Sequence, residues 1–413
     1  MRTLSTNHPV KDMNILHINT YLHGGAAIAA LRTHHVLLQN GIKSKFLCLS
    51  GNLKDRQQTF QVDKKHRKTS LKLIASKTIY KLALLTGKTS RHEMFSLPYS
   101  SYDLSIEKLI SQADIIHLHW VSGFVDFPTF FKKIKKPIIW TLHDMNAFSG
   151  AFHYEDDRLF NESPLLRKMD MMIKRLKESI FKQVKNLYIT TPSQWLMYKS
   201  KKSIAFSHLP HAHIPPLIDT TVFRMSDKQQ AREKSGLPAE GIIFTFMSEK
   251  LDNKRKGLEI LLKSIKLLLE DLNEKVTIVN IGEGRCDINH SINMGRINDP
   301  GKIAEILSAS DALLLPSRED NFPNVMVEAN ACGCPVIAFP VGGIKEFITD
   351  YFNGLLSQEV SAQSLKETLE LFIANRQRFD PATIREHIVK TYSPHNHVAK
   401  YIAIYKHLLA DAQ

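Results

Sequence analysis

Residues 311–346 constrain the fold of this chain more than any other stretch of its sequence, DALLLPSREDNFPNVMVEANACGCPVIAFPVGGIKE. The apolar run at 312–315 predicts a buried strand, and a polar loop follows it. A helix is expected from about Asn324 to just before Gly333, since proline favours a helix start and glycine favours a helix end. A second apolar run, 336–339, predicts another strand that leads into a Gly-Gly turn. This order of strand, loop, helix and strand predicts a parallel sheet.

The loop and the helix start within this stretch predict an anion site. Unpaired N–H groups at Asn324 and Val325 and the positive end of a helix dipole would meet at the carboxyl edge of the sheet. Asp320 lies before the helix, and Glu328 lies about a turn inside it. Carboxylates are poor ligands for phosphate, but they accept hydrogen bonds from sugar hydroxyls. The residues therefore predict a pocket for a sugar joined to a diphosphate; the alternative is an ordinary strand–helix–strand unit with a charged surface loop.

These residues also carry a resemblance to a known family. The spacing of Asp320 and Glu328, the Pro-Ser pair before them and the run EANACGCPVIAFPVGG resemble the donor signature of retaining glycosyltransferases with the GT-B architecture. The match is closest to the family 4 group (group 1) that builds bacterial surface polysaccharides. The resemblance implies an α/β fold with two Rossmann-like parallel-sheet domains facing across a cleft. The family usually has Glu where this chain has Asp320, which shortens the reach of the carboxylate by one methylene.

The length of 413 residues also favours two domains, because it exceeds one typical hydrophobic core. We expect an N-terminal tail at 1–12 and an N-terminal Rossmann-like acceptor domain at 13–210. The proline-rich stretch at 211–219 is predicted to be the linker, and 220–394 the domain that binds the nucleotide sugar. In the family a final helix, here 395–413, packs back on the first domain.

Composition favours a cytoplasmic protein. No apolar run approaches the roughly 20 residues that a membrane-spanning helix needs, and the N-terminus lacks the apolar core of a secretion signal. The four cysteines suggest a reducing compartment, and Cys332 and Cys334 have no further metal ligands nearby in the sequence.

The positive charge lies in the first half of the chain. Residues 1–210 hold 32 Lys and Arg against 15 Asp and Glu, whereas the remainder holds 23 against 26. Two segments, 54–91 and 167–185, interleave basic and apolar positions, which suits an anionic inner-membrane surface. The alternative is solvated helix faces on a basic protein. Nucleic acid is not an expected partner, because no recognisable nucleic-acid-binding motif is present.

Two loops are candidates to bind the diphosphate. Lys256, with Arg255 beside it, stands in NKRKG before a predicted helix, where phosphate sites form, and the resemblance places this motif against the diphosphate. Gly24 and Gly25 lie where the first strand turns into its helix, and glycine lets the backbone approach a ligand closely. The resemblance puts this loop against the donor phosphate and the reacting sugar.

His143 is the candidate for the reacting end of the sugar. It ends a predicted strand in TLHD and matches the active-site histidine of the family. Asp144 is expected to fix the tautomer of His143 or to bind the acceptor. His117 and His119 in HLHW also end a strand and are expected to line the acceptor side.

Gly282 in NIGEG follows a strand and is expected to border the nucleotide base, and Arg296 is a similar candidate. No Asp-x-Asp stands after an apolar strand, and the acidic cluster 155–157 is typical of a solvated loop. We therefore expect no metal site, because Lys256, Arg255 and the helix end can stabilise the leaving diphosphate.

The resulting hypothesis is a retaining, metal-independent glycosyltransferase with no cofactor besides its nucleotide-diphosphate sugar. The sugar would pass to a glycan or lipid-linked acceptor during assembly of bacterial exopolysaccharide, capsule or lipopolysaccharide, in the cytoplasm or peripherally at the inner membrane. In this hypothesis His143 lies at the reacting carbon, Asp320 holds sugar hydroxyls, Glu328 the ribose, and Lys256 the diphosphate. The alternatives are a GT-B phosphorylase or epimerase, and a non-catalytic scaffold that binds nucleotide sugars or membranes.

Overall fold

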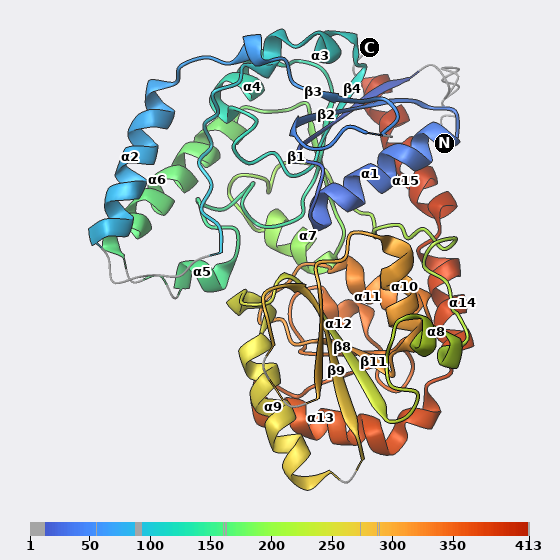
Figure 1. Cartoon of the computed structure of the whole chain (residues 1–413). Coiled ribbons are helices and arrows are strands. Elements are labelled where there is room, and N and C mark those ends of the chain that lie inside the picture. Colours follow the sequence, from blue (N-terminus) through green and yellow to red (C-terminus); the bar gives the residue numbers. More distant parts are fainter. Residues whose placement is uncertain are drawn as a thin grey trace. The chain divides into compact units, whose positions relative to one another are not determined.

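The chain divides into two compact units (Figure 1). Unit 1 is Met1–Pro215 together with His395–Gln413, and unit 2 is Pro216–Pro394. The computed structural model describes residues 13–54, 56–86, 93–159, 161, 163–272, 274–286, 288 and 290–411. The tail expected at 1–12 lies outside these residues, as do six residues of the basic segment 54–91, namely Asp55 and 87–91.

Unit 1 contains a seven-stranded parallel sheet in the order β3-β2-β1-β4-β5-β6-β7. The strands are β1 (Asn14–Tyr21), β2 (Lys43–Ser50), β3 (Thr59–Gln61), β4 (Ile115–Leu118), β5 (Ile138–Thr141), β6 (Leu187–Thr191) and β7 (His211–His213). The helices are α1 (Gly25–Gln39), α2 (Leu71–Thr86), α3 (Lys108–Gln112), α4 (Phe127–Lys133), α5 (Glu155–Leu159), α6 (Pro164–Phe181), α7 (Gln194–Lys201) and α15 (Pro394–Asp411). Short 3₁₀ turns occur at Lys64–His66 and Leu104–Ile106.

The two faces of this sheet differ in chemistry, because side chains alternate between faces along each strand. One face is apolar: Leu16, Ile116 and Trp140 join the aromatic side chains of α4 and α6 in one core. The neighbouring positions, such as His17 and His117, are fully buried on the opposite face.

Helix α15 covers the polar face of the sheet together with α1, and Figure 1 shows the two helices close together. Buried side chains of α15 form hydrogen bonds both to the strands of the sheet and to α1. Tyr405 Oη lies 2.9 Å from His117 Nδ1, and Tyr401 Oη lies 2.8 Å from Thr141 Oγ1. His397 Nε2 lies 2.9 Å from Thr33 Oγ1 of α1. The C-terminal helix thus completes the core of the N-terminal unit.

Unit 2 contains a six-stranded parallel sheet in the order β10-β9-β8-β11-β12-β13. This is the 3-2-1-4-5-6 order of a Rossmann fold. The strands are β8 (Ile242–Lys250), β9 (Val276–Glu283), β10 (Ser291–Gly295), β11 (Ala312–Leu315), β12 (Val336–Ala338) and β13 (Gly354–Leu356). The helices are α8 (Lys228–Lys234), α9 (Leu258–Asp271), α10 (Pro300–Ala309), α11 (Asn324–Ala331), α12 (Ile344–Phe347), α13 (Ala362–Asn375) and α14 (Pro381–Thr391), with 3₁₀ turns η4 (Lys254–Lys256) and η5 (Arg376–Arg378).

The predicted α/β class with two Rossmann-like parallel sheets is confirmed. The prediction of a linker over 211–219 was wrong at its start, where β7 pairs with β6 at the edge of the sheet. Pro210 hid this strand from the sequence pattern, but its carbonyl accepts a bond from Ile189 N, which needs no N–H from proline. Among the described residues, no helix is both long and apolar enough to cross a membrane.

Candidate functional site

The predicted diphosphate loop of unit 2 lies at the switch point of its sheet, where neighbouring strands β8 and β11 lead to opposite sides. After β8 the chain forms η4 and enters α9 through Gly257, which has a φ of 75°. A Cβ at this glycine would lie 1.8 Å from the carbonyl oxygen of Pro316, just after β11. Arg318 N also donates to Arg255 O at 2.8 Å. The two loops are therefore in direct backbone contact.

This contact brings together three of the predicted site residues. Lys256 Nζ lies 2.6 Å and Arg255 Nη1 3.2 Å from Asp320 Oδ2. Ser317 Oγ donates to the same oxygen at 3.2 Å. Burial raises the pKa of Asp320, but Lys256 and Arg255 outweigh it, so that the pKa is lower than usual. Asp320 is therefore ionised at neutral pH, and the three charged side chains carry one net positive charge.

Glycine also shapes the other side of Asp320. Gly342, in the Gly-Gly turn after β12, has a φ of 53°, and a Cβ there would lie 1.7 Å from Asp320 O. Gly343 N donates to Asn321 O at 2.9 Å. The turn predicted from the sequence thus supports the backbone of the acidic loop.

Helix α11 begins at Asn324, as predicted, and has no side-chain cap. Pro323 stands at the cap position, so the backbone N–H groups of Asn324 and Val325 lie in its first turn. Glu328 lies in the second turn and is 7% exposed, close to the value for Asp320. The helix start and both carboxylates therefore belong to one buried loop–helix segment.

Gly282 and Arg296 have local structural contacts. Gly282 has a φ of 151°, and a Cβ there would lie 2.0 Å from Ser248 O. It allows the end of β9 to approach the end of β8. Arg296 Nη1 pairs with Glu283 Oε1 at 2.8 Å on the surface. A role beside the nucleotide base stays a prediction for both residues.

The remaining predicted site residues lie at the carboxyl edge of the sheet in unit 1. Gly24, with a φ of 84°, precedes α1, and Gly25 is its first residue. His143 follows β5, with its Nε2 atom 3.5 Å from His119 Nδ1. Burial lowers the pKa of His143 to about 4, although Asp144 opposes this shift. His143 is therefore neutral at pH 7 and can donate one hydrogen bond and accept another.

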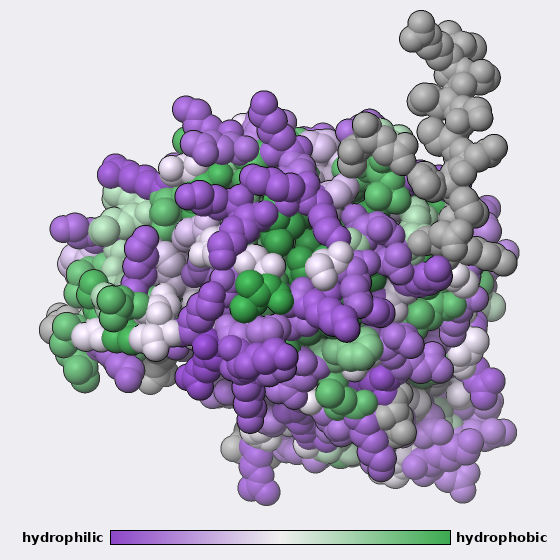
Figure 2. Space-filling model, turned by 90° about the horizontal axis from the view of Figure 1, so that it is seen from above, coloured by the Kyte–Doolittle hydropathy of each residue, from purple (hydrophilic) through white to green (hydrophobic). Residues whose placement is uncertain are grey.

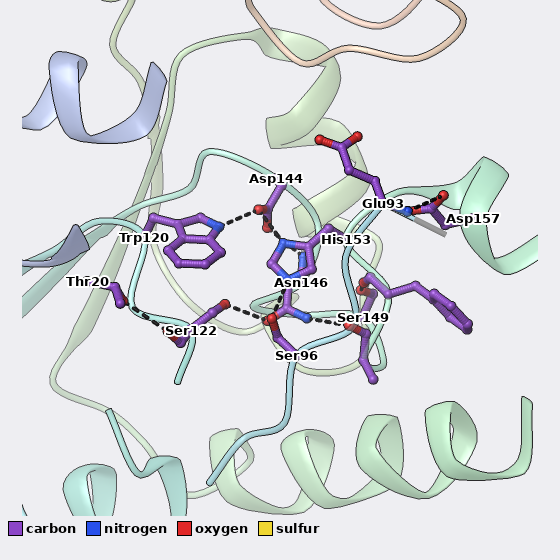
Figure 3. A network of polar contacts seen from close by, with 12 residues as sticks. Thr20, Glu93, Ser96, Trp120, Ser122, Asp144, Asn146, Ser149, His153 and Asp157 are labelled. Carbon is purple, nitrogen blue, oxygen red and sulfur yellow. Dashed lines mark hydrogen bonds and ion pairs between the residues drawn. The ribbon is translucent and has the colours of Figure 1, made fainter. Parts of the chain in front are cut away.

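Asp144 is the centre of a polar network beside His143 (Figure 3). Its Oδ2 atom accepts from Trp120 Nε1 at 2.9 Å and lies 2.6 Å from His153 Nδ1. Its Oδ1 atom accepts from Asn146 N at 2.9 Å. His153 Nε2 lies 2.7 Å from Ser96 Oγ. Burial raises the pKa of Asp144, yet His153 and the other donors lower it overall. The network fixes the indole and the loop after β5.

The prediction that His117 lines the acceptor side was wrong, since it is fully buried and its Nδ1 atom bonds to Tyr405 of α15. His119 is also buried, but its ring lies next to His143, as its Nδ1 atom is 3.5 Å from His143 Nε2. Burial is the main cause of the strong lowering of their pKa values and that of His17. The ligand atoms of these three histidines all lie within 4.8 Å of one another, close enough to hold a metal ion. The polar pattern at the end of β4 was misleading for His117, because α15, which is distant in the sequence, covers this residue.

Several residues of this edge were not predicted from the sequence. Trp120 follows β4 and bonds to Asp144. Lys177 of α6 is fully buried and donates to the carbonyl oxygens of Asn146 and Gly150. Burial lowers the pKa of Lys177 to about 7, although Asp144 opposes this. Only the Trp after HLH was a usable signal, because Lys177 is one of several similar lysines in its helix.

Comparison with known proteins gives a family match that lies within unit 2. Residues 227–387 match the family model of glycosyl transferases group 1. D-inositol 3-phosphate glycosyltransferase of Arthrobacter sp. (strain FB24) is 27% identical over 285 residues, 65% of this chain and 63% of that protein. The enzyme of the same name from Segniliparus rotundus is 25% identical, over 64% and 59%. The matched part of the chain thus spans about three fifths of the length of these curated relatives.

Solved structures share the fold of the chain. Sucrose-phosphate synthase from Thermosynechococcus elongatus has a TM-score of 0.68 and 17% identity, covering 97% of this chain and all of that one. Anabaena HepE, solved in complex with UDP and glucose, has a TM-score of 0.63 and 14% identity, covering 95% and 99%. Both carry the GT-B architecture of paired Rossmann-like domains expected from the sequence. The resemblance to the glycosyl transferases group 1 family is confirmed: residues 227–387 match its model, and the chain shares the fold of GT-B glycosyltransferases.

Proposed function

We propose that this protein is a retaining, metal-independent glycosyltransferase that uses a nucleotide-diphosphate sugar. The observation that carries the proposal is the cluster of Lys256, Arg255 and Asp320 at the switch point of unit 2. Ligands of Rossmann-like sheets bind at this point. The cluster lies within the part of the chain that matches the family.

The cluster has the charge that a departing nucleotide diphosphate requires. Negative charge grows on the leaving phosphates as the bond to the sugar breaks, so fixed positive charge lowers the barrier. The side chains of Lys256 and Arg255 are 19% and 9% exposed, and they would act in a largely water-excluded site. The N–H groups at the start of α11 would add neutral donors to the same anion.

The two carboxylates would orient the donor. Asp320 would accept hydrogen bonds from the sugar and Glu328 from the ribose. The acceptor hydroxyl would attack from the face that the diphosphate leaves, and a leaving phosphate oxygen would take its proton. Neutral His143 would donate a hydrogen bond near the reacting carbon. The contribution of the protein is then orientation and charge stabilisation.

The acceptor is proposed to be a glycan or lipid-linked sugar at an anionic inner-membrane surface. Helices α2 and α6 contact each other and combine basic residues with exposed apolar ones. Leu71 and Leu85 of α2 are 78% and 82% exposed, and Met172 of α6 is 61% exposed. Figure 2 shows hydrophobic groups at the edge where Figure 1 places these helices. Binding to anionic vesicles that weakens with salt would support this part of the proposal.

A ligand-binding and product assay tests the main proposal. Thermal shifts with UDP-, GDP-, ADP- and dTDP-sugars would identify the donor, and chromatography would identify the products with and without a glycan acceptor. Lys256→Ala should weaken donor binding at least tenfold. The control Lys263→Ala, which removes an exposed side chain of α9, should not. NMR should show that the new glycosidic bond in the product has the same anomeric configuration as the sugar in the donor. Turnover should persist in EDTA.

The same assay separates the alternatives. Sugar released to phosphate would identify a phosphorylase, and a changed sugar still attached to the nucleotide would identify an epimerase. Normal donor affinity without transfer to any acceptor would favour a non-catalytic scaffold.

A further inference from the structure

Two aromatic residues stand on either side of the switch point in unit 1. Tyr21 is the last residue of β1, and Trp120 follows β4, its neighbour in the sheet. The chain leaves these two strands toward opposite sides of the sheet, which opens a crevice at their carboxyl ends. The sequence prediction for the ends of β1 and β4 involved Gly24, Gly25, His117 and His119, and it gave no role to Tyr21 or Trp120.

The two rings are stacked and partly open to solvent. Their centroids are 5.7 Å apart, with an angle of 28° between the ring planes. Tyr21 is 38% exposed, and Trp120 is half-buried. The exposed imidazole of His23 meets the Tyr21 ring edge-on at 5.1 Å. Partial exposure distinguishes this pair from the aromatic side chains of the apolar core.

Hydrogen bonds between β1 and the chain after β4 hold the pair in place. Trp120 N donates to Asn19 Oδ1 at 2.8 Å, and Thr20 N donates to Trp120 O at 2.8 Å. Asn19 Nδ2 donates to Tyr21 O at 2.7 Å. Figure 3 shows the indole directed at Asp144, its partner through Nε1. The rings are therefore preorganised, and a ligand would bind with little loss of side-chain freedom.

The surroundings of the rings are polar. Ser122 Oγ lies 3.5 Å from Asn146 Oδ1, and the half-buried Ser122, Asp144 and His143 all follow the ends of β4 and β5. A pyranose ring presents an apolar C–H face and a rim of hydroxyl groups. An exposed aromatic face with polar side chains nearby matches both of these features.

We infer that Tyr21 and Trp120 form a stacking platform for a pyranose ring of the acceptor. The sugar would lie on the open face of Tyr21, which Trp120 supports from beneath. This inference rests on the proposed function, because it names the site for the second substrate. It assigns the acceptor to the class of glycosides and not to a non-sugar alcohol.

Binding and kinetics together test the platform. Saturation-transfer NMR on the full chain would use the methyl α- and β-pyranosides of glucose, galactose, mannose and N-acetylglucosamine as probes. With irradiation of aromatic protons, the C–H protons of one sugar face should show the strongest transfer. The signal should fall severalfold in Tyr21→Ala and persist in Tyr21→Phe.

For a pyranoside that accepts sugar, Tyr21→Ala should raise the acceptor KM about tenfold, as loss of one stacking contact predicts, and leave the donor KM unchanged. The control is Tyr198→Ala, since Tyr198 is 56% exposed on α7 of the same unit. Equal acceptor KM in Tyr21→Ala and wild type, or no pyranoside signal in the wild-type protein, would overturn the inference. Pyranoside binding that depends on Tyr21, without any transfer, would uphold the platform and count against the proposed function.

Discussion

Lys256 Nζ lies 2.6 Å from Asp320 Oδ2, so the residue expected to hold the diphosphate is paired with the residue expected to hold the sugar. Arg255 contacts the same carboxylate oxygen. One negative charge therefore positions two positive ones before any ligand arrives. A diphosphate would compete with Asp320 for these cations, which couples the binding of the phosphates to the orientation of the sugar ligand.

Replacing Asp320 separates these two roles. Asp320→Asn should keep or tighten the binding of the nucleotide diphosphate alone, because both cations are freed, and should lower turnover of the nucleotide sugar strongly. It should also destabilise unit 2 by about 3 kcal/mol, since two partly buried cations lose their partner. Calorimetric titration with UDP and GDP and a turnover assay measure these effects. Asp320→Glu is the control, because it keeps the negative charge beside Lys256 and Arg255. Weaker diphosphate binding in Asp320→Asn would contradict this account.

The close approach at Gly257 should be intolerant of any side chain. Gly257→Ala should weaken donor binding and stability, because its Cβ would lie 1.8 Å from Pro316 O. Gly236→Ala is a matched control: Gly236 also has a positive φ, 66°, but a Cβ there would meet none of the described residues within 4 Å beyond its chain neighbours. Both variants bear the backbone strain of about 1–2 kcal/mol. Urea unfolding should therefore show a larger loss for Gly257→Ala, and equal losses would refute the contact.

The buried histidines of unit 1 should make it sensitive to acid. Burial lowers the pKa of His34, His143 and His397 to about 4, and those of His17 and its neighbours are also strongly lowered. The unfolded chain binds protons below pH 6.5, whereas the folded unit does not, so stability falls between about pH 6.5 and 4. Each histidine contributes up to about 1.4 kcal/mol per pH unit.

Tryptophan fluorescence can follow this acid sensitivity, because all three tryptophans, at positions 120, 140 and 195, lie in unit 1. The urea midpoint of the fluorescence change should drop steeply as the pH falls from 6.5 to 4.5. His117→Gln, which retains hydrogen-bonding groups, should have a shallower dependence. A midpoint independent of pH in this range would exclude neutral buried histidines.

Lys177 should give a pH dependence of the same sign as the histidines, but at higher pH. Its pKa is about 7 in the folded unit, and that of an unfolded lysine is about 10.5. Below pH 7 the lysine is charged in both states and destabilises the fold by the full amount. Above pH 7 the folded lysine loses its proton first, so stability rises with pH.

The slope of stability against pH measures this effect. From pH 7 to 8.5 the unfolding free energy of the wild-type protein should rise more than that of Lys177→Met, by up to about 1.4 kcal/mol per pH unit. The slope is the decisive quantity, because Lys177→Met also leaves the carbonyl oxygens of Asn146 and Gly150 without this donor. Parallel slopes would show that Lys177 titrates outside this range.

Local patterns were sufficient to predict the elements around the donor loop. The apolar run before Asp320 forms β11, and Pro323 precedes α11 as expected. The spacing of Asp320 and Glu328 is a property of one short segment, so it could be read directly. The pairing of Asp320 with Lys256 could not, because 64 positions separate them and only the sheet topology brings them together.

Burial in unit 1 was the main feature that the sequence could not predict. The alternation in HLHW marks two faces of a strand, but it does not show that the polar face lies under α15. Lys177 has the same local context as the exposed lysines of α6, and its burial depends on the loop after β5. In both examples the deciding contact comes from a distant part of the chain.

The position of α15 has a consequence for the order of assembly during synthesis. Unit 2 leaves the ribosome before the segment that starts at His395, yet Tyr401 and Tyr405 supply bonding partners for Thr141 and His117. Until α15 emerges, His117 and Thr141 of the nascent first unit lack these two partners. Folding of the first unit therefore depends on translation of α15, so a chain that stops before His395 should have a misassembled N-terminal half.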